Sequence, residues 1–348
     1  MSRIIDVPAG VVGVPPVPVE PEETAPGQAR LLSVIAPVFN EADGVTELVT
    51  RLAASCSQVG MPFELIVVND GSADPTLAKL VELSATVPEL RVVDLFRNFG
   101  HMPALAAGVA LSKGDAVIVM DGDLQDPPEL IPQLVTCWKD GADVAYGLRT
   151  EAHGGAARRL GTRLFYWLLR ASRTTIPENV GTFGLMDRRV VDVLNSMPER
   201  SRFFAGLRWW VGGRQAYVEY KRSPRGHGRS RVGALGLFGL AQTALTSFSK
   251  VPLRLASMLS LVCGLGLFVV GATAIAIRVF TPLGVPGWAT YTTLIGMMGF
   301  VQSVVLAVIA EYVGIIFDEV KARPLFVVRS EFRSGSPVQV VSGDRVGV

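Results

Sequence analysis

The chain has 348 residues, of which 49% are hydrophobic and 18% charged, and its mean hydropathy is +0.38. That hydropathy is too high for a purely soluble protein of this charge content, and the length predicts about two domains. The net charge of +2 gives no case for nucleic-acid binding, and three widely spaced cysteines exclude a disulfide framework and fit a reducing compartment.

Residues 1–30 contain six prolines and an acidic cluster. They lack the continuous apolar core and the cleavage site of a signal peptide. We expect this segment to be a disordered tail with polyproline character. A docking segment for a partner protein is the alternative.

From residue 31, short apolar runs alternate with segments of helical periodicity. The runs have the composition of buried strands in a mostly parallel sheet. Their alternation with helices predicts an α/β, Rossmann-like domain with right-handed crossovers. The runs span residues 31–39, 63–70, 90–96, 115–123 and 143–149, and the first two helical segments span residues 41–56 and 74–87.

The fourth apolar run ends in MDGDLQDPP, which places Asp121, Asp123 and Asp126 within six residues. Such like charges repel one another unless a positive group lies among them. Mg²⁺ binds through one or two carboxylates together with substrate phosphates, so Asp121 and Asp123 are predicted to hold a divalent metal against a diphosphate. For Asp126 we expect a structural role, as the N-cap of a helix that begins at Pro127.

Polar residues also follow the first three runs. The carboxyl ends of parallel strands form the ligand-binding edge of such a sheet, so these residues are expected to converge with the aspartates. Asn69 and Asp70 can hydrogen-bond a base or a ribose, and Gly71 permits close backbone approach. An Asx-turn without a ligand is the alternative. Arg97 and His101 follow the third run, and the residues alone assign them no role.

A basic cluster at residues 221–233 precedes the apolar last third of the chain. Arginine forks match phosphate oxygens, so the cluster predicts a site for a lipid phosphate, joined by Arg149 and the arginines that follow it. Attraction to anionic headgroups and a solvated basic collar are the alternatives.

Two apolar stretches, residues 255–280 and 291–317, are each long enough to span the hydrocarbon of a bilayer. Basic residues flank their outer ends, so the positive-inside rule places both ends in the cytoplasm. A buried globular hairpin is the alternative. The predicted organisation is a disordered tail at 1–30, an α/β domain at 31–232, an interfacial segment at 233–254, two transmembrane helices within 255–317 and a cytoplasmic tail at 318–348.

Several motifs, in this order, resemble the polyprenyl-phosphate glycosyltransferases. These are family 2 glycosyltransferases with a GT-A fold, similar to dolichyl-phosphate mannose synthases and bactoprenol glucosyltransferases. The resemblance covers roughly residues 31–330 and rests on APVFNEADG, VVNDGSAD, RNFGHMPAL, MDGDLQDPPEL, VGTFGLMDRRVVDVL, RSPRGHGRSRVG and AEYVGIIFDEVKARPLFVV.

The resemblance implies an enzyme that transfers a sugar, with inversion, from a UDP- or GDP-linked donor to an undecaprenyl or decaprenyl phosphate. It implies Mg²⁺ or Mn²⁺ as cofactor and a product used for cell-envelope glycans or protein glycosylation. It also implies a multi-pass protein of the inner membrane, a homo-oligomer, whose catalytic domain and termini are cytoplasmic.

The family's functional positions carry over to three groups of residues. The nucleotide-sugar group is Pro37, Phe39, Glu41, Val68, Asn69, Asp70, Asp121, Gly122 and Asp123, and the metal group is Asp121 and Asp123 with Gln125. The acceptor-phosphate group is Arg149, Arg158, Arg159, Arg163, Arg225, Ser230 and Arg231.

The chain departs from the family pattern at two places. The family carries two aspartates where this chain has Asn69-Asp70, and it carries Asp-Phe-Arg where this chain has residues 182–184, Thr-Phe-Gly. These losses are what a catalytically degenerate membrane protein that binds nucleotide sugars or tethers partners would have, which is the alternative function. A processive polysaccharide synthase is disfavoured, because Arg208-Trp209 lacks the glutamine of Gln-x-x-Arg-Trp and two spans are too few.

Overall fold

The structure is a computed structural model that describes residues 3–5, 30–150, 180–197, 199, 204–222, 251–280 and 287–338. The chain divides into a sheet-based unit and a helical unit, residues 235–321 with a short earlier segment. In chain order the elements are β1 (Arg3–Ile5), β2 (Leu32–Val38), α1 (Val45–Ser57), β3 (Phe63–Asn69), α2 (Thr76–Thr86), β4 (Leu90–Leu95), α3 (His101–Leu111), β5 (Ala116–Val119), η1 (Pro128–Leu130), α4 (Ile131–Lys139), β6 (Val144–Arg149), β7 (Val180–Asp187), α6 (Arg188–Ser196), α7 (Phe204–Val211), β8 (Gln215–Tyr220), α9 (Val251–Phe280), α10 (Trp288–Val320), β9 (Val328–Arg333) and β10 (Ser336–Val338).

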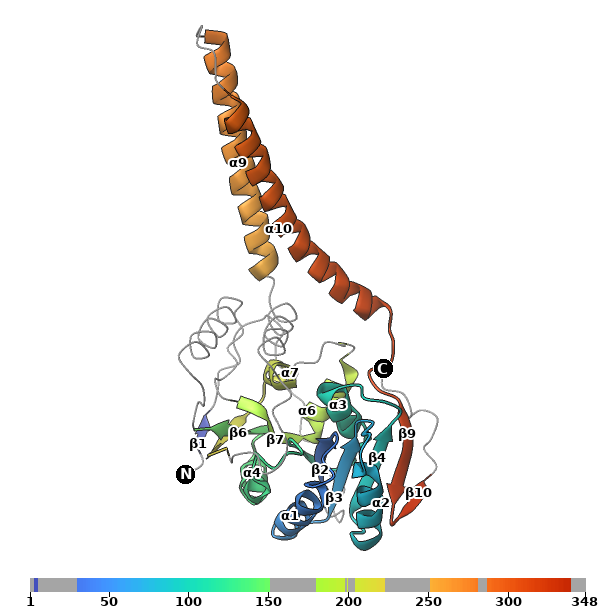
Figure 1. Ribbon diagram of the computed structural model, residues 1–348. Coiled ribbons are helices and arrows are strands. Elements are labelled where there is room, and N and C mark those ends of the chain that lie inside the picture. Colours follow the sequence, from blue (N-terminus) through green and yellow to red (C-terminus); the bar gives the residue numbers. More distant parts are fainter. Residues whose placement is uncertain are drawn as a thin grey trace. The chain divides into compact units, whose positions relative to one another are not determined.

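The strands of the sheet-based unit form one sheet in the order β1-β8-β6-β7-β5-β2-β3-β4-β9-β10 (Figure 1). The predicted strands are confirmed as β2 to β6, and β5, β2, β3 and β4 are parallel neighbours. The sheet is mixed rather than mostly parallel, because β7 pairs antiparallel with both β5 and β6, and β9 pairs antiparallel with β4. Neither β7 nor β9 has the continuous apolar run that revealed the central strands.

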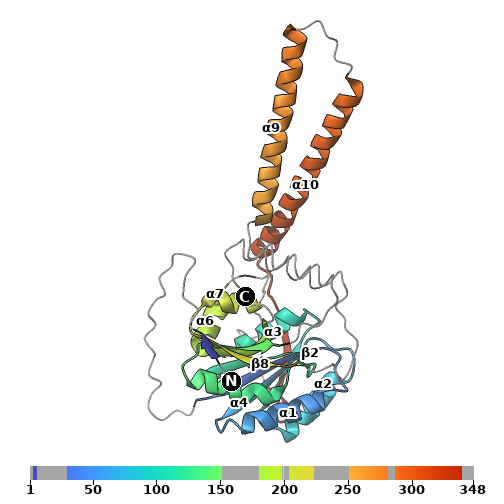
Figure 2. The ribbon, with the colours of Figure 1, turned by 90° about the vertical axis from the view of Figure 1, so that its left-hand side faces the viewer.

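Helices cover both faces of this sheet (Figures 1 and 2). Helix α1 contacts α2 and α4 on one face, whereas α6 contacts α3 and α7 on the other. Every residue of β2, β4 and β5 is buried as a result, which is what coverage of both faces requires. Because β3 and β5 lie on opposite sides of β2, the carboxyl ends of β2 and β5 border the point where the strand order reverses, which is where α/β sheets bind ligands.

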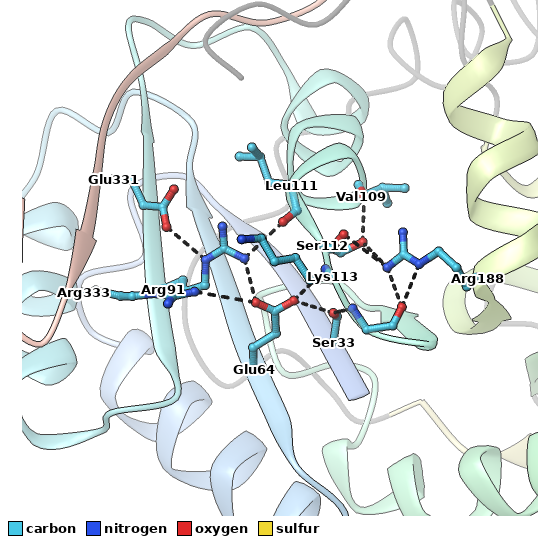
Figure 3. A network of polar contacts seen from close by, with 11 residues as sticks. Ser33, Glu64, Arg91, Val109, Leu111, Ser112, Lys113, Arg188, Glu331 and Arg333 are labelled. Atoms are coloured by element: carbon cyan, nitrogen blue, oxygen red, sulfur yellow. Dashed lines mark hydrogen bonds and ion pairs between the residues drawn. The ribbon is translucent and has the colours of Figure 1, made fainter. Parts of the chain in front are cut away.

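A buried ion-pair network lies near the other ends of these strands (Figure 3). Arg91 is 4% exposed, and its Nη1 lies 2.6 Å from Glu64 Oε2 while its Nε lies 3.0 Å from Glu331 Oε1. The Ser33 hydroxyl and the Lys113 backbone N–H both donate to Glu64 Oε1, at 2.6 and 2.8 Å. The network therefore joins β9 to the starts of β2, β3 and β4.

The strands β9 and β10 lie within residues 318–348, for which the sequence indicated only a tail. Similarly, β1 lies within the proline-rich first thirty residues and pairs with β8. Both are edge additions to a sheet that the central strands already define. The pairing of β9 with β4 places chain from beyond α10 in the sheet-based unit.

The helical unit contains α9 and α10, which contact each other. Among the described residues, one helical stretch, Leu294–Val320, is long and apolar enough to cross a membrane, with a mean hydropathy of 2.1. The apolar stretch described in α9, Ala256–Gly266, is shorter. The helices bracket the two apolar segments of the sequence, and a two-helix transmembrane hairpin stays a prediction.

Arg91→Met is expected to lower the free energy of unfolding by about 3–5 kcal/mol, because it removes the main cation of the buried Glu64 and of the partly buried Glu331, and leaves Glu64 only the more distant Arg333 at 4.0 Å. Arg51 is the matched control. It also contacts two glutamates, Glu47 and Glu129, but its side chain is 33% exposed, so Arg51→Met should cost less than about 1 kcal/mol. Denaturant unfolding of the purified full chain measures both, and equal losses would contradict a role for the buried network.

Candidate active site

A pocket opens where β2 and β3 end and α3 begins. Its wall is formed by Pro37, Val38 and Phe39 from the end of β2, by Asp70, and by Asn98, Gly100, His101 and Ala104 around the start of α3. Three predicted nucleotide contacts, Pro37, Phe39 and Asp70, therefore line one pocket. His101, which the sequence left without a role, lines it with them.

The loops after β2 and β3 are tied to each other by hydrogen bonds. The Asn40 N–H donates to Ser72 Oγ at 2.9 Å, and the Ala73 N–H donates to Asn40 Oδ1 at 2.8 Å. The backbone of Glu41 donates to Thr76 Oγ1 at 3.0 Å. Asn40 has a φ of +51°, a left-handed conformation that asparagine tolerates better than most residues. The chain's own hydrogen bonds thus fix this wall of the pocket.

Asp70 ties the loop after β4 to the same wall. Its carboxylate accepts hydrogen bonds from the backbone N–H groups of Phe99 and Gly100, at 2.7 and 2.9 Å. Burial raises the pKa of Asp70, although these two hydrogen bonds act against the shift. Gly71 has a φ of +64°, and a Cβ there would lie 2.4 Å from the carbonyl carbon of Arg97. Only glycine permits this approach of the two loops.

Two residues predicted to contact the nucleotide point elsewhere. Asn69 is 1% exposed, and its amide Nδ2 donates to Asp94 Oδ1 on the neighbouring strand at 2.7 Å. Its Oδ1 accepts from the Ser72 N–H at 3.4 Å. Val68 is fully buried and its side chain lies beside Gly108 of α3. Of the group after β3, Asp70 is the residue that lines the pocket.

The Asp-Gly-Asp segment after β5 is packed against the end of β2. A Cβ on Gly122 would lie 2.5 Å from the Pro37 carbonyl oxygen, so the residue between the two aspartates has to be glycine. Leu124 has a φ of +57°, which is unfavourable for a residue with a Cβ and is found mostly where surrounding structure enforces it. The Gln125 N–H donates to Asp123 Oδ1 at 3.1 Å. The segment is therefore held in one conformation.

Positive groups lie among the aspartates, as their clustering required. His101 Nε2 lies 3.2 Å from Asp121 Oδ1, and Arg222 Nη2 lies 3.6 Å from Asp121 Oδ2. Burial alone would raise the pKa of Asp121, but the imidazole of His101 at 3.2 Å and the charges of Arg149 and Arg222 outweigh it and lower the pKa. Asp121 is thus an ionised carboxylate at neutral pH.

Asp126 is fully buried beside this pair and does not cap a helix; Pro127 precedes η1 instead. The Tyr220 hydroxyl donates to Asp126, and Arg149 Nη2 lies 3.4 Å from both carboxylate oxygens. Arg149 Nε also donates to the Tyr220 hydroxyl at 3.0 Å. Burial raises the pKa of Asp126 more than the arginines lower it. The prediction that Asp126 caps a helix is therefore wrong: Asp126 belongs to a buried cluster with Tyr220 that orients Arg149.

The other acceptor-phosphate residues lie outside the described part of the chain. They are Arg158, Arg159, Arg163, Arg225, Ser230 and Arg231. The structure adds His101, Tyr220 and Arg222 to the site. A signal existed for Arg222, within the basic cluster, and for His101, after a strand end, but Tyr220 ends a strand that the sequence did not predict.

A divalent metal fits the donor set that Asp121, Asp123 and Gln125 provide, because all three offer the oxygen ligands that Mg²⁺ and Mn²⁺ prefer. Among the described residues, no group of three or more His, Cys, Asp or Glu side chains is arranged to hold a metal by itself. Such a site needs further ligands from a substrate, which a diphosphate would supply.

Comparison with known proteins places this arrangement in a family. A model of glycosyl transferase family 2 matches residues 33–194. An uncharacterized glycosyltransferase of Synechocystis is 38% identical over 85% of this chain and 94% of its own length. The SfII prophage-derived bactoprenol glucosyl transferase of Shigella flexneri is 36% identical over 88% of this chain and 99% of its own length.

Among solved structures, glucosyl-3-phosphoglycerate synthase from Mycobacterium tuberculosis, in complex with Mn²⁺, UDP and glucosyl-3-phosphoglycerate, is 22% identical. The matched region spans 63% of this chain and 80% of the synthase chain. Its TM-score of 0.45 is too low to transfer a ligand or a mechanism. The family match and the mixed sheet identify a GT-A-like domain. The match and the two relatives, almost all of whose length this chain covers, show that the chain belongs to glycosyltransferase family 2.

Proposed function

We propose that this glycosyltransferase transfers a sugar from a UDP- or GDP-linked donor to a polyprenyl phosphate at the cytoplasmic face of the inner membrane. The observation that carries the proposal is the convergence of the loops after β2, β3, β4 and β5 at one edge of the sheet. There His101 lines the pocket and also lies 3.2 Å from Asp121. The relatives named bactoprenol glucosyl transferase support a polyprenyl phosphate as acceptor. The product would serve cell-envelope glycans or protein glycosylation.

The acceptor phosphate is itself the nucleophile. Its oxygen attacks the anomeric carbon while the bond to the nucleoside diphosphate breaks on the opposite face, so the configuration inverts. A phosphate is ionised at neutral pH and needs no strong general base, which leaves positioning and charge neutralisation as the main sources of catalysis. Asp121 and Asp123, beside Gln125, would hold Mg²⁺ or Mn²⁺, which when bound neutralises the leaving diphosphate.

Three cationic side chains near the aspartates suit the phosphate groups of the two substrates, the donor diphosphate and the acceptor phosphate. His101 and Arg222 lie beside Asp121 and offset its charge, and both are groups that a donor diphosphate would also attract. Arg149 is held by Asp126 and Tyr220, so its guanidinium is oriented before an acceptor arrives. Preorganised charge of this kind costs no rearrangement during the reaction. We assign Arg149, with the predicted arginines at 158–163 and 225–231, to the acceptor phosphate.

We further propose that α9 and α10 form a two-helix transmembrane hairpin. Support comes from the apolar stretch Leu294–Val320 and from the second apolar segment at residues 255–280. Basic residues beyond both outer ends favour cytoplasmic termini. The hairpin would keep the catalytic domain at the surface where lipid phosphates are exposed, and homo-oligomers would form around it.

The degenerate-protein alternative rests on Asn69 and on residues 182–184. The contact between Asn69 and Asp94 weakens it, because an asparagine here pairs with a buried aspartate on the next strand rather than replacing a ligand contact. Metal-dependent transfer of labelled sugar into an organic-extractable lipid distinguishes the two functions. A donor screen with undecaprenyl phosphate and Mg²⁺ or Mn²⁺, read by mass spectrometry of the lipid, identifies the sugar.

Asp123→Ala is expected to reduce sugar transfer by about a hundredfold or more, because a charge-neutralising group at the leaving diphosphate is lost. The thermal midpoint of the variant should stay close to that of the wild type. Asp140→Ala, at an exposed aspartate that follows α4, is the control and should retain activity. Full activity of Asp123→Ala in the lipid-product assay would refute the assignment.

Asn69→Asp is expected to destabilise the chain, by roughly 1–3 kcal/mol at neutral pH, because two buried carboxylates would then face each other. Arg329 Nη1 lies 3.5 Å from Asp94 Oδ2 but is half exposed, so it compensates only part of the added charge. The folded-state pKa of one carboxylate therefore rises above the unfolded value of about 4, and the loss grows as the pH increases from there. Thermal unfolding at pH 5 and pH 8 tests this. The exchange Asn69→Asp with Asp94→Asn should recover stability, and a single variant as stable as the wild type at pH 8 would contradict the assigned contact.

A further inference from the structure

Arg208 of α7 is a fully buried arginine within the catalytic domain, with 0% of its surface exposed. One nitrogen, Nη2, donates to the Gly181 carbonyl oxygen at 2.7 Å. Its guanidinium carbon lies 5.0 Å from the ring centre of Tyr146 and 5.6 Å from that of Phe204. The cation is therefore enclosed by aromatic rings and the backbone of β7.

Among the described residues, no carboxylate contacts this enclosed cation. Within the part of the chain that the structure describes, Arg208 Nε and Nη1 have no hydrogen-bond acceptor, and the adjacent Tyr146 hydroxyl has no partner either. Arginine stays protonated in proteins, and an uncompensated buried charge costs several kcal/mol. These three buried polar atoms belong to two residues in contact through the Tyr146 ring, and they depart from the rule that buried polar groups are paired. The departure points to a ligand for them.

The cluster lies close to the predicted metal-binding segment. Arg208 Nη1 occupies the space over Gly184, where an added Cβ would lie 2.9 Å away. Gly184 pairs across the sheet with Val119, the last residue of β5, and with Tyr146 on the other side. The glycine at 184, one of the departures from the family pattern, makes room for this guanidinium. The cluster is thus one strand away from the residues that lead into Asp121.

We infer that Arg208 and Tyr146 form a subsite for a phosphate group of one of the two substrates. The chemistry matches, because a guanidinium with two unused N–H groups and a phenol hydroxyl are donors suited to phosphate oxygens. The phosphate could come from the lipid acceptor or from the donor diphosphate, and this inference rests on the proposed function. Because Arg208 is enclosed, a phosphate reaches it only through a local opening of the chain.

Arg208→Met separates this role from a structural one. Replacing an unpaired buried charge by an apolar side chain of similar length removes a desolvation cost, so the thermal midpoint of the purified full chain should be unchanged or higher. The KM for one phosphate-bearing substrate should rise roughly ten- to a hundredfold, the worth of a charge-assisted hydrogen bond. Arg208→Lys keeps the positive charge but not the forked guanidinium, so its KM should lie between those of the wild type and Arg208→Met.

The two sources of phosphate are distinguished by kinetics. A higher KM for polyprenyl phosphate with an unchanged donor KM assigns the subsite to the acceptor, and the reverse assigns it to the donor. Tyr146→Phe removes a single hydroxyl at constant shape and should raise the same KM by a smaller factor. Arg214→Met, at an exposed arginine in the loop after α7, is the matched control and should alter neither KM.

A binding experiment decides the inference independently of sugar transfer. Inorganic phosphate should raise the thermal midpoint of the wild type more than that of Arg208→Met, because a ligand stabilises the state that binds it. Equal shifts in the two proteins, or a variant that is destabilised while both KM values are retained, would overturn the subsite. A wild type that transfers no sugar to any lipid phosphate would refute the proposed function, while the phosphate shifts would still test Arg208.

Discussion

Clustered carboxylates at the strand-order reversal are the constraint on which the rest of the site depends. Asp121 and Asp126 are held close together away from bulk water, an arrangement that requires compensating charge. The fold supplies it from distant segments: His101 begins α3, Arg149 ends β6 and Arg222 follows β8. The cations that compensate the cluster are also groups whose N–H donors suit phosphate oxygens. Stability and the proposed function therefore use one set of charges.

The loops around this cluster are fixed through one another rather than through a ligand. Asp70 holds the loop after β4, Ser72 and Asn40 join the loops after β3 and β2, and Gly122 lets the segment after β5 rest on the end of β2. A chain of contacts thus runs across all four parallel strands. Preorganisation of this kind reduces the entropy that a substrate must lose in binding, and it makes exact loop positions depend on side chains far apart in sequence.

Local patterns in the sequence were enough to predict β2 to β6, α1 and α2, because each is a buried run or an amphipathic segment. They could not predict β9, whose alternating charges gain meaning only when Arg91, 240 positions earlier, lies beside Glu331. The same holds for Asn69: its partner Asp94 is its cross-strand neighbour, which no local pattern reveals. Asp121 and Asp123 could be proposed as a metal-binding pair from the sequence alone, because both acids lie in one short segment.

The carboxylates that surround a buried arginine indicate whether its role is structural or is left for a ligand, as three arginines of this chain illustrate. Arg91 contacts two carboxylates near the ends of the strands opposite to the site, so its charge is fully compensated within the fold. Arg149 is compensated in part by Asp126 and remains directed toward the aspartate cluster. Arg208, among the described residues, has a carbonyl oxygen and aromatic rings but no carboxylate. From Arg91 through Arg149 to Arg208, the described partners thus compensate less and less of the buried charge. The charge of Arg208 is the one that we propose a substrate phosphate to compensate.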